Sequence, residues 1–117
     1  MRLIKAREGR LVEGKGYSKK VLLTSEHIGL AGTLLQEVSF LPGEKVPCHH
    51  HSVQTEIIYA LTEVRFEING KEVILRPGDI IICEPGDHHG NPHIPFEMRI
   101  LVLKIDYRED DTIWDES

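Results

Sequence analysis

Short apolar or alternating runs, each closed by a turn signal, recur from one end of the chain to the other. Runs of this length, bounded by Gly, Pro, Asn and Asp, are typical of the strands of an all-β domain. No long helical periodicity competes with them. The sequence therefore predicts an all-β fold with strands at residues 21–23, 33–41, 56–61, 64–68, 72–75, 79–83 and 96–105.

The turn signals between these runs are specific. Asn69-Gly70 separates two of the runs, and this dipeptide is the strongest short-range signal for a β-hairpin. Pro77-Gly78 and Pro85-Gly86 suit tight turns, because proline fixes φ and glycine accepts a positive φ. We therefore expect antiparallel strands joined by short connections.

Two segments carry expectations about packing. The run 79–83 holds three consecutive isoleucines, which favours a strand buried on both faces. The tail, residues 107–117, is acidic apart from Ile113 and Trp114. We expect these two side chains either to pack back on the domain or on a second subunit, or else to belong to a frayed end.

Size and charge limit the class of protein. With 117 residues, 40% of them hydrophobic and 28% charged, we expect one globular domain spanning residues 1–117. A net charge of −5 and scattered basic residues argue against nucleic-acid binding. No apolar run approaches the roughly 20 residues of a membrane span, and the N-terminus lacks a signal-peptide core. We therefore expect a cytoplasmic protein in which Cys48 and Cys83 are free thiols.

Histidines gather in two places, and a carboxylate lies near the first. On a strand, residues i and i+2 share a face, so His49 and His51 can converge while His50 points away. Imidazoles and carboxylates are ligands for a divalent transition metal ion such as Fe, Mn, Zn, Ni, Cu or Co. The residues that predict such a site are His49, His51, Glu56 and a histidine of the pair His88-His89.

The first of these clusters resembles the first motif of the cupin superfamily, G-x5-H-x-H-x(3,4)-E-x6-G. Gly43, His49, His51 and Glu56 fit its positions in order. Glu63 occupies the position of the closing glycine, which is a departure from the motif.

The second cluster resembles the second cupin motif, G-x5-P-x-G-x2-H-x3-N. Gly78, Gly86 and His89 fall at matching intervals. Glu84 stands at the proline position and His93 at the asparagine position. The interval between the glycine and the histidine selects His89 rather than His88 as the ligand.

The resemblance covers about residues 32–103 and implies an antiparallel jelly-roll β-barrel of about six to eight strands. It also implies a homodimer formed through the N-terminal strands. His88 and His93 are left as candidates for a catalytic proton carrier or a substrate contact. The metal ligands that it implies, lining the interior near one open end, are His49, His51, Glu56 and His89.

Other polar and sulfur-bearing residues have a less specific place in the pattern. Cys48 should face away from His49 as an exterior or interfacial thiol, and Cys83 should be a small core residue. Several side chains on or beside predicted strands either line the cavity or are solvated, and we favour solvation. They are Gln36, Glu37, Gln54, Tyr59, Arg65, Glu67 and Arg99.

Three functional hypotheses follow. The first is an enzyme that acts on a small organic molecule through metal-assisted dioxygenase, isomerase or lyase chemistry. The second is a non-catalytic barrel that binds or senses a metal or a small ligand. The third, which we favour least, is a structural domain that holds only adventitious metal. The fold alone does not choose between them.

Overall fold

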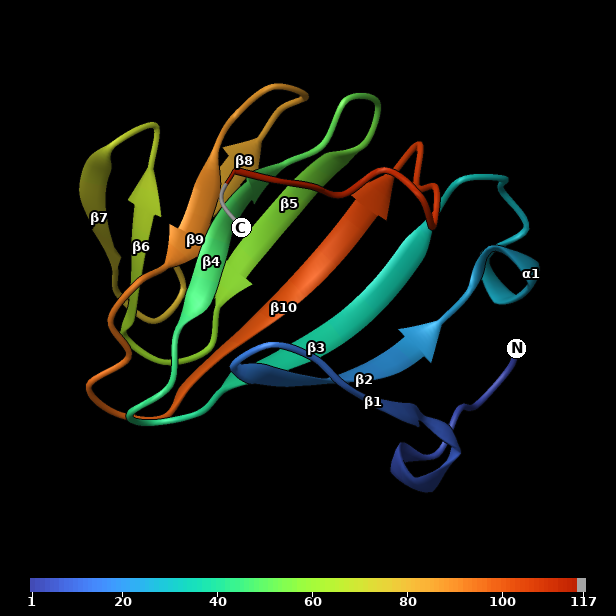
Figure 1. Ribbon diagram of the computed structural model, residues 1–117. Coiled ribbons are helices and arrows are strands. Elements are labelled where there is room, and N and C mark those ends of the chain that lie inside the picture. Colours follow the sequence, from blue (N-terminus) through green and yellow to red (C-terminus); the bar gives the residue numbers. More distant parts are fainter. Residues whose placement is uncertain (116–117) are drawn as a thin grey trace.

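The computed structural model describes residues 1–115, which form two antiparallel β-sheets packed face to face (Figure 1). The six-stranded sheet has the order β1 (Arg10–Glu13), β2 (Tyr17–Leu23), β3 (Leu34–Phe40), β10 (Met98–Ile105), β5 (Thr55–Ala60) and β8 (Ile80–Cys83). The five-stranded sheet has the order β11 (Ile113–Trp114), β4 (Val46–His50), β9 (His89–Asn91), β6 (Val64–Ile68) and β7 (Lys71–Leu75).

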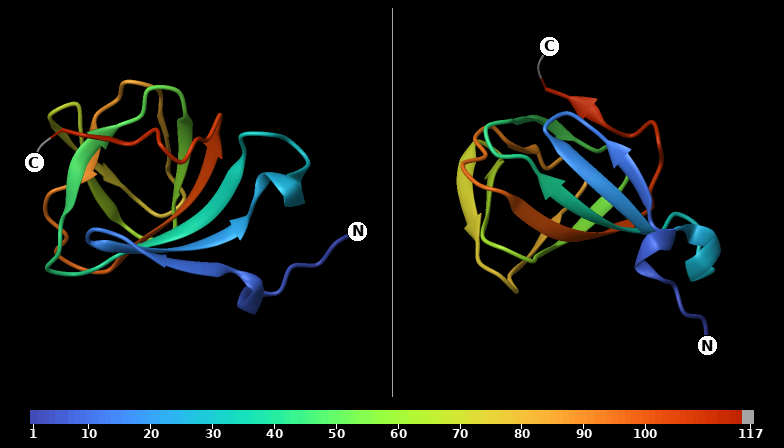
Figure 2. Two further views of the ribbon diagram at one scale, coloured as in Figure 1. Left: turned by 45° about the vertical axis from the view of Figure 1, so that its right-hand side comes forward. Right: turned by 90° about the horizontal axis from the view of Figure 1, so that it is seen from below.

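The predicted all-β antiparallel jelly-roll fold is confirmed. The two sheets form a sandwich that curves around a common interior and does not close into a continuous barrel (Figure 2). The described helices are the 3-10 turn η1 (Ala6–Glu8) and the one-turn α1 (Ser25–Ile28). Neither is long or apolar enough to cross a membrane.

Each of the seven predicted runs contains or overlaps a strand. The structure adds strands without a matching run: β4, which the spacing of its histidines had indicated, and the short strands β1, β9 and β11. The β6–β7 hairpin turns at Asn69 and Gly70, whose φ values are 51° and 81°. A two-residue hairpin loop of type I′ needs two successive positive φ values, which explains this dipeptide.

The isoleucine strand differs from the prediction. β8 was expected to be buried on both faces, but Ile80 and Ile82 are 59% and 56% exposed. The reason is its position, because β8 is the edge of the six-stranded sheet and pairs only with β5 among the described strands. No described element covers the outer face of this edge, so its apolar run has one solvated side.

Alternation along the strands builds the core. In β10 the inward row is Met98, Ile100, Val102 and Lys104, all at most 7% exposed. The first three pack in the apolar core, where full burial of such a side chain contributes about 1.5–3 kcal/mol. The same row ends in the charged side chain of Lys104, so the interior becomes polar at that end.

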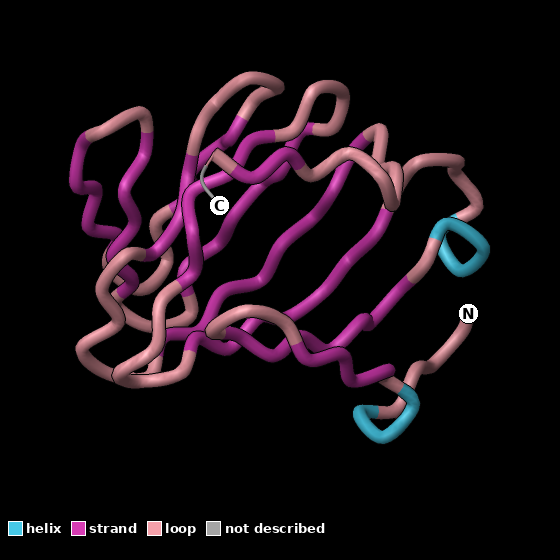
Figure 3. The backbone as a smooth tube through the Cα atoms, in the orientation of Figure 1, coloured by secondary structure: helices cyan, strands magenta, loops and turns pink. Residues whose placement is uncertain are grey.

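The acidic tail packs back on the domain as far as residue 115. After a loop, β11 pairs with the edge of β4 and so extends the five-stranded sheet (Figure 3). The Asp111 carboxylate accepts hydrogen bonds from the backbone amides of Ser52, Val53 and Gln54 at 2.8, 2.9 and 2.9 Å. The tail is therefore tied to the loop that follows β4. Its last two residues, 116 and 117, lie outside the described part.

Candidate metal centre and pocket

Three histidines on or beside strands of the five-stranded sheet meet at the polar end of the interior. His49 lies on β4, His51 follows it, and His89 begins β9 opposite His49. The ring centroids of His49 and His89 are 4.4 Å apart. The ring centroid of His51 lies 5.3 Å from that of His49 and 5.4 Å from that of His89. One ligand atom from each ring lies within 4.8 Å of the other two.

Backbone carbonyl groups fix the orientation of all three rings. Nδ1 of His49 lies 3.0 Å from the oxygen of Pro47, that of His51 2.8 Å from Asp111, and that of His89 2.9 Å from Asp87. A carbonyl oxygen only accepts hydrogen bonds, so Nδ1 carries the proton in His49 and His89 and Nε2 is left as the ligand atom. Nδ1 of His51 lies 2.8 Å from Nε2 of Gln54 as well as from its carbonyl group. Such outer contacts are typical of metal-binding histidines.

Glu56 brings a carboxylate to this cluster from β5 in the other sheet. Its Oε1 lies 3.0 Å from Nε2 of His89 and 3.5 Å from Nε2 of His51. Its Oε2 lies 3.5 Å from Nζ of Lys104. Nε2 of His51 is buried and has no hydrogen-bond partner among residues 1–115. A buried nitrogen without a partner beside a carboxylate fits a cation between them.

The protonation of the cluster is uneven. Burial, with the neighbouring His89, lowers the pKa of His49 to about 4. Burial would also lower the pKa of His89, but the contact with Glu56 raises it above its ordinary value. Burial alone would raise the pKa of Glu56, yet His51, His89 and Lys104 hold it well below its usual range. Glu56 is therefore ionised, with the ammonium group of Lys104 beside one oxygen and the imidazoles of His51 and His89 beside the other.

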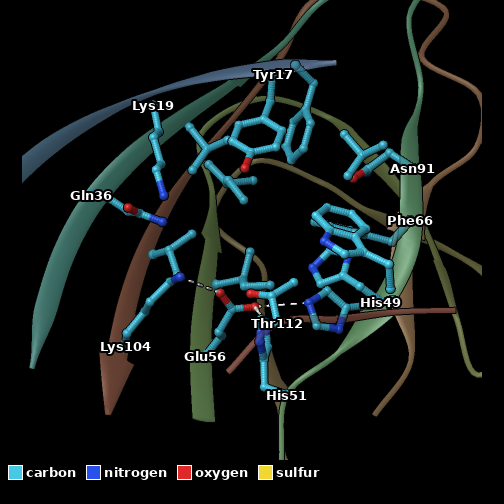
Figure 4. A pocket seen from close by; sticks show the side chains of 18 residues that line it. Tyr17, Lys19, Gln36, His49, His51, Glu56, Phe66, Asn91, Lys104 and Thr112 are labelled. Carbon is cyan, nitrogen blue, oxygen red and sulfur yellow. Dashed lines mark hydrogen bonds and ion pairs between the residues drawn. The ribbon is translucent and has the colours of Figure 1, made fainter. Parts of the chain in front are cut away.

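A pocket of about 120 Å³ opens in front of these residues (Figure 4). One part of its wall is polar and includes Tyr17, Lys19, Gln36 and Lys104. Burial, followed by the charge of Lys104, lowers the pKa of Lys19. The apolar part of the wall consists of Val38, Phe40, Val46, Ile58, Phe66, Ile100 and Val102.

A family model for the cupin domain matches residues 36–103, more than half of the chain. This chain belongs to the cupin family. The oxalate-binding protein of Thermotoga maritima is 32% identical to it over 97 residues, covering 77% of this chain and 80% of the relative.

Solved structures agree on the cupin fold. The polyketide cyclase RemF from Streptomyces resistomycificus superposes with a TM-score of 0.82 at 21% identity, covering 100% of this chain and 87% of RemF. A predicted oxalate decarboxylase from Thermotoga maritima has a TM-score of 0.73 at 23% identity, covering 89% and 98%. At these identities the likeness concerns the fold.

The other histidines of this cupin lie outside the pocket. His50 and His88 stack on each other at 4.3 Å on the opposite face of β4 and β9, which agrees with the outward orientation expected for His50. His93 is exposed and lines a separate surface hollow with Lys45 and Pro47. The structure therefore does not bring His88 or His93 to the cluster of His49, His51 and His89.

The remaining predicted residues divide between interior and surface. Gln36 lines the pocket and Gln54 is buried beside His51, so solvation was the wrong expectation for both. Cys83 is a buried core residue, as predicted, and Cys48 faces Glu67 on the outside. The others are partly or largely exposed, with Arg99 paired to Glu37 and Arg65 to Glu63, and they are Glu37, Tyr59, Arg65, Glu67 and Arg99.

Part of the pocket was not predicted from the sequence. Lys104 was detectable, because it continues the alternating row of Ile100 and Val102. Lys19 shares an inward face with Tyr17 and was detectable in the same way. Trp114 was expected to pack back on the domain as one of the alternatives for the tail, but its place in the pocket was not predicted. Asp111 carried no usable signal, since its position depends on contacts with the distant loop after β4.

Proposed function

We propose that this cupin binds one divalent transition metal ion through His49, His51, Glu56 and His89 and acts on a small organic anion beside it. The observation that carries this proposal is the common orientation of the three imidazoles, each held by a backbone carbonyl at Nδ1. Such an ion, when bound, supplies Lewis acidity toward an oxygen ligand.

The polar wall supports an anionic substrate. Lys19 and Lys104 place two ammonium groups in the pocket, where Glu56 is the one carboxylate among residues 1–115. Oε1 of buried Gln36 is a further polar atom, and it has no partner within the described chain. Two cations in a partly buried site favour a carboxylate, because charge attraction is stronger away from bulk water.

The size of the pocket supports a substrate of few atoms. Its volume of about 120 Å³ is near that of an engineered cavity of about 150 Å³ that admits benzene. A dicarboxylate of two carbons meets this limit and carries the required charge. The relative named as an oxalate-binding protein points to the same class of ligand.

The side chains around the anion have separable tasks. Lys19 and Lys104 orient the carboxylate, and Lys104 also holds Glu56 in place. Burial, and to a smaller extent the negative charge of Glu56, raises the pKa of Tyr17. The Tyr17 hydroxyl therefore stays protonated and can donate a hydrogen bond. Thr112 and Trp114 of the tail line the same pocket. Reaction by dioxygenase, isomerase or lyase chemistry is the prediction for the enzyme.

A non-catalytic binding protein is the second candidate. The name of the Thermotoga relative describes binding and no reaction, which favours this alternative. Incubation of the metal-loaded protein with oxalate in air, followed by ion chromatography, separates the two. Consumption of oxalate with turnover supports the enzyme, and unchanged oxalate with measurable binding supports the binding protein.

The test of the site itself uses untagged protein loaded with Zn²⁺ or Mn²⁺ and analysed by plasma mass spectrometry. The His49→Ala/His89→Ala variant should hold one metal equivalent fewer than the parent chain. His93→Ala, which removes an exposed histidine, is the matched control and should lose none. A double variant that retains all the metal sinks the assignment. The anion site has its own test. In calorimetry with the metal-loaded protein, Lys19→Gln should bind oxalate at least tenfold more weakly than the parent chain.

A further inference from the structure

A second cluster of ligand side chains lies on the outer face of the five-stranded sheet, behind the pocket. We propose that His50, His88 and Asp115 form a second binding site for a divalent metal ion of the Zn²⁺ type. This site uses none of the residues assigned to the inner centre and lies on the other side of β4.

Strand alternation creates the pair of outward histidines. His49 and His89 are register partners on β4 and β9, and both face the interior. Their chain neighbours His50 and His88 therefore face outward, side by side. Their rings stack with centroids 4.3 Å apart and an interplanar angle of 26°. The same pairing that assembles the inner centre thus places two imidazoles together outside.

The tail supplies the carboxylate. Asp115 follows β11, and its backbone amide donates to the oxygen of Cys48 at 3.0 Å. Its Oδ2 lies 2.7 Å from Nδ1 of His88, and its Oδ1 lies 3.6 Å from Nδ1 of His50. One ligand atom from each of the three side chains lies within 4.8 Å of the others.

The contacts of His50 Nδ1 favour a metal ligand over a simple ion pair with Asp115. Its Nδ1 is shielded from solvent and has no hydrogen-bond partner among residues 1–115. The distance of 3.6 Å to Asp115 is too long for a hydrogen bond. A buried nitrogen facing a carboxylate without bonding to it is satisfied by a cation that both can reach.

The donor set suits zinc and its neighbours. Two imidazoles and one carboxylate are three of the ligands that Zn²⁺ takes, and a water completes the tetrahedron. Cys48 and Glu67 line the hollow beside Asp115 and His88, so the carboxylate of Glu67 adds a favourable negative potential. His88 is 46% exposed in its side chain, which gives the ion a route from solvent.

Occupation of the outer site would tie the tail to the sheet. Trp114 precedes Asp115, lines the inner pocket, and lies with its ring centroid 4.8 Å from that of His49. A metal ion held by Asp115 and the two histidines would therefore stabilise the segment that walls the pocket.

Zn²⁺ stoichiometry tests the proposal. The parent chain should bind two equivalents, and His88→Ala should bind one. The inner double variant, His49→Ala/His89→Ala, should keep one equivalent and lose it when His88→Ala is added. His93→Ala is the control and should bind two equivalents of Zn²⁺, like the parent chain. His88→Ala removes a half-exposed side chain, so loss of folding does not confuse the result.

The outcomes separate the two sites. One equivalent in the parent, unchanged by His88→Ala and lost in the inner double variant, overturns the outer site and keeps the inner one. One equivalent lost only with His88→Ala keeps the outer site and overturns the inner one. Hydrogen exchange gives an independent readout. In the inner double variant, Zn²⁺ should slow exchange of the Asp115 amide several-fold, and no slowing contradicts the tie between metal and tail.

Discussion

Nζ of Lys104 lies 3.5 Å from Oε2 of Glu56 inside the pocket, and both side chains are buried. The other oxygen of this carboxylate faces His51 and His89. Glu56 thus connects the ammonium wall to the imidazole cluster across the two sheets. Its buried charge depends on partners from both sides, so loss of one partner has consequences for stability as well as for binding.

Lys104→Met should destabilise the metal-free protein by roughly 3 kcal/mol, because a buried carboxylate loses its ammonium partner. Urea unfolding of the two proteins without metal measures this difference. Zn²⁺ should recover more stability in the variant than in the parent, because the ion replaces the lost cation. Lys71→Met, at an exposed lysine, is the control. Equal stability of Lys104→Met and the parent contradicts the role given to this pair.

Metal affinity should fall as the pH is lowered from 8 to 5.5. The raised pKa of His89 means that a proton occupies its Nε2 at mildly acidic pH and competes with the ion. Each competing proton weakens binding by about tenfold per pH unit below its pKa. His49, with a pKa of about 4, adds no competition in this range. Zn²⁺ titrations with a fluorescent competitor measure the profile, and a flat profile rules out the role of His89.

The sequence predicted the parts of this protein that depend on local pattern. The apolar runs and the Asn69-Gly70 turn identified most strands. The two spaced motifs predicted that His49 and His89 belong to one site, and the structure pairs them. Ile80 shows the limit of such patterns, since an apolar run does not reveal which strand becomes a sheet edge. Asp111 shows another, because its partners lie more than fifty residues earlier.

Asp111→Ala should release the tail and weaken the metal site. The substitution leaves three backbone amides of the loop after β4 without their acceptor, at a cost of roughly 2 kcal/mol. It also frees the carbonyl that orients His51, so Zn²⁺ affinity should drop about tenfold or more. Calorimetry and urea unfolding measure the two effects. Asp110→Ala, one residue earlier and exposed, should change neither.

The same residue gives stability a defined pH dependence. Burial opposes ionisation of Asp111, but the amides of Gln54, Val53 and Ser52 hold its pKa below the ordinary value. Its contribution is therefore complete above the unfolded pKa of about 3.9 and is lost as the pH falls through the folded pKa. The stability difference between the parent and Asp111→Ala should shrink below pH 4, and a constant difference contradicts this assignment.

Both cysteines should react slowly with iodoacetamide at pH 8. Burial, followed by Glu67, raises the pKa of Cys48 to about 11, and burial with Glu56 raises that of Cys83 to about 12. The thiolate is the nucleophile, so labelling of Cys48 should accelerate as the pH rises toward 11. Mass spectrometry of timed samples measures the rates. Glu67→Gln removes the neighbouring charge and should speed the labelling of Cys48 while leaving Cys83 unchanged. Fast labelling of the parent at pH 8 would show that the Cys48 thiol is not held by Glu67 on this outer face.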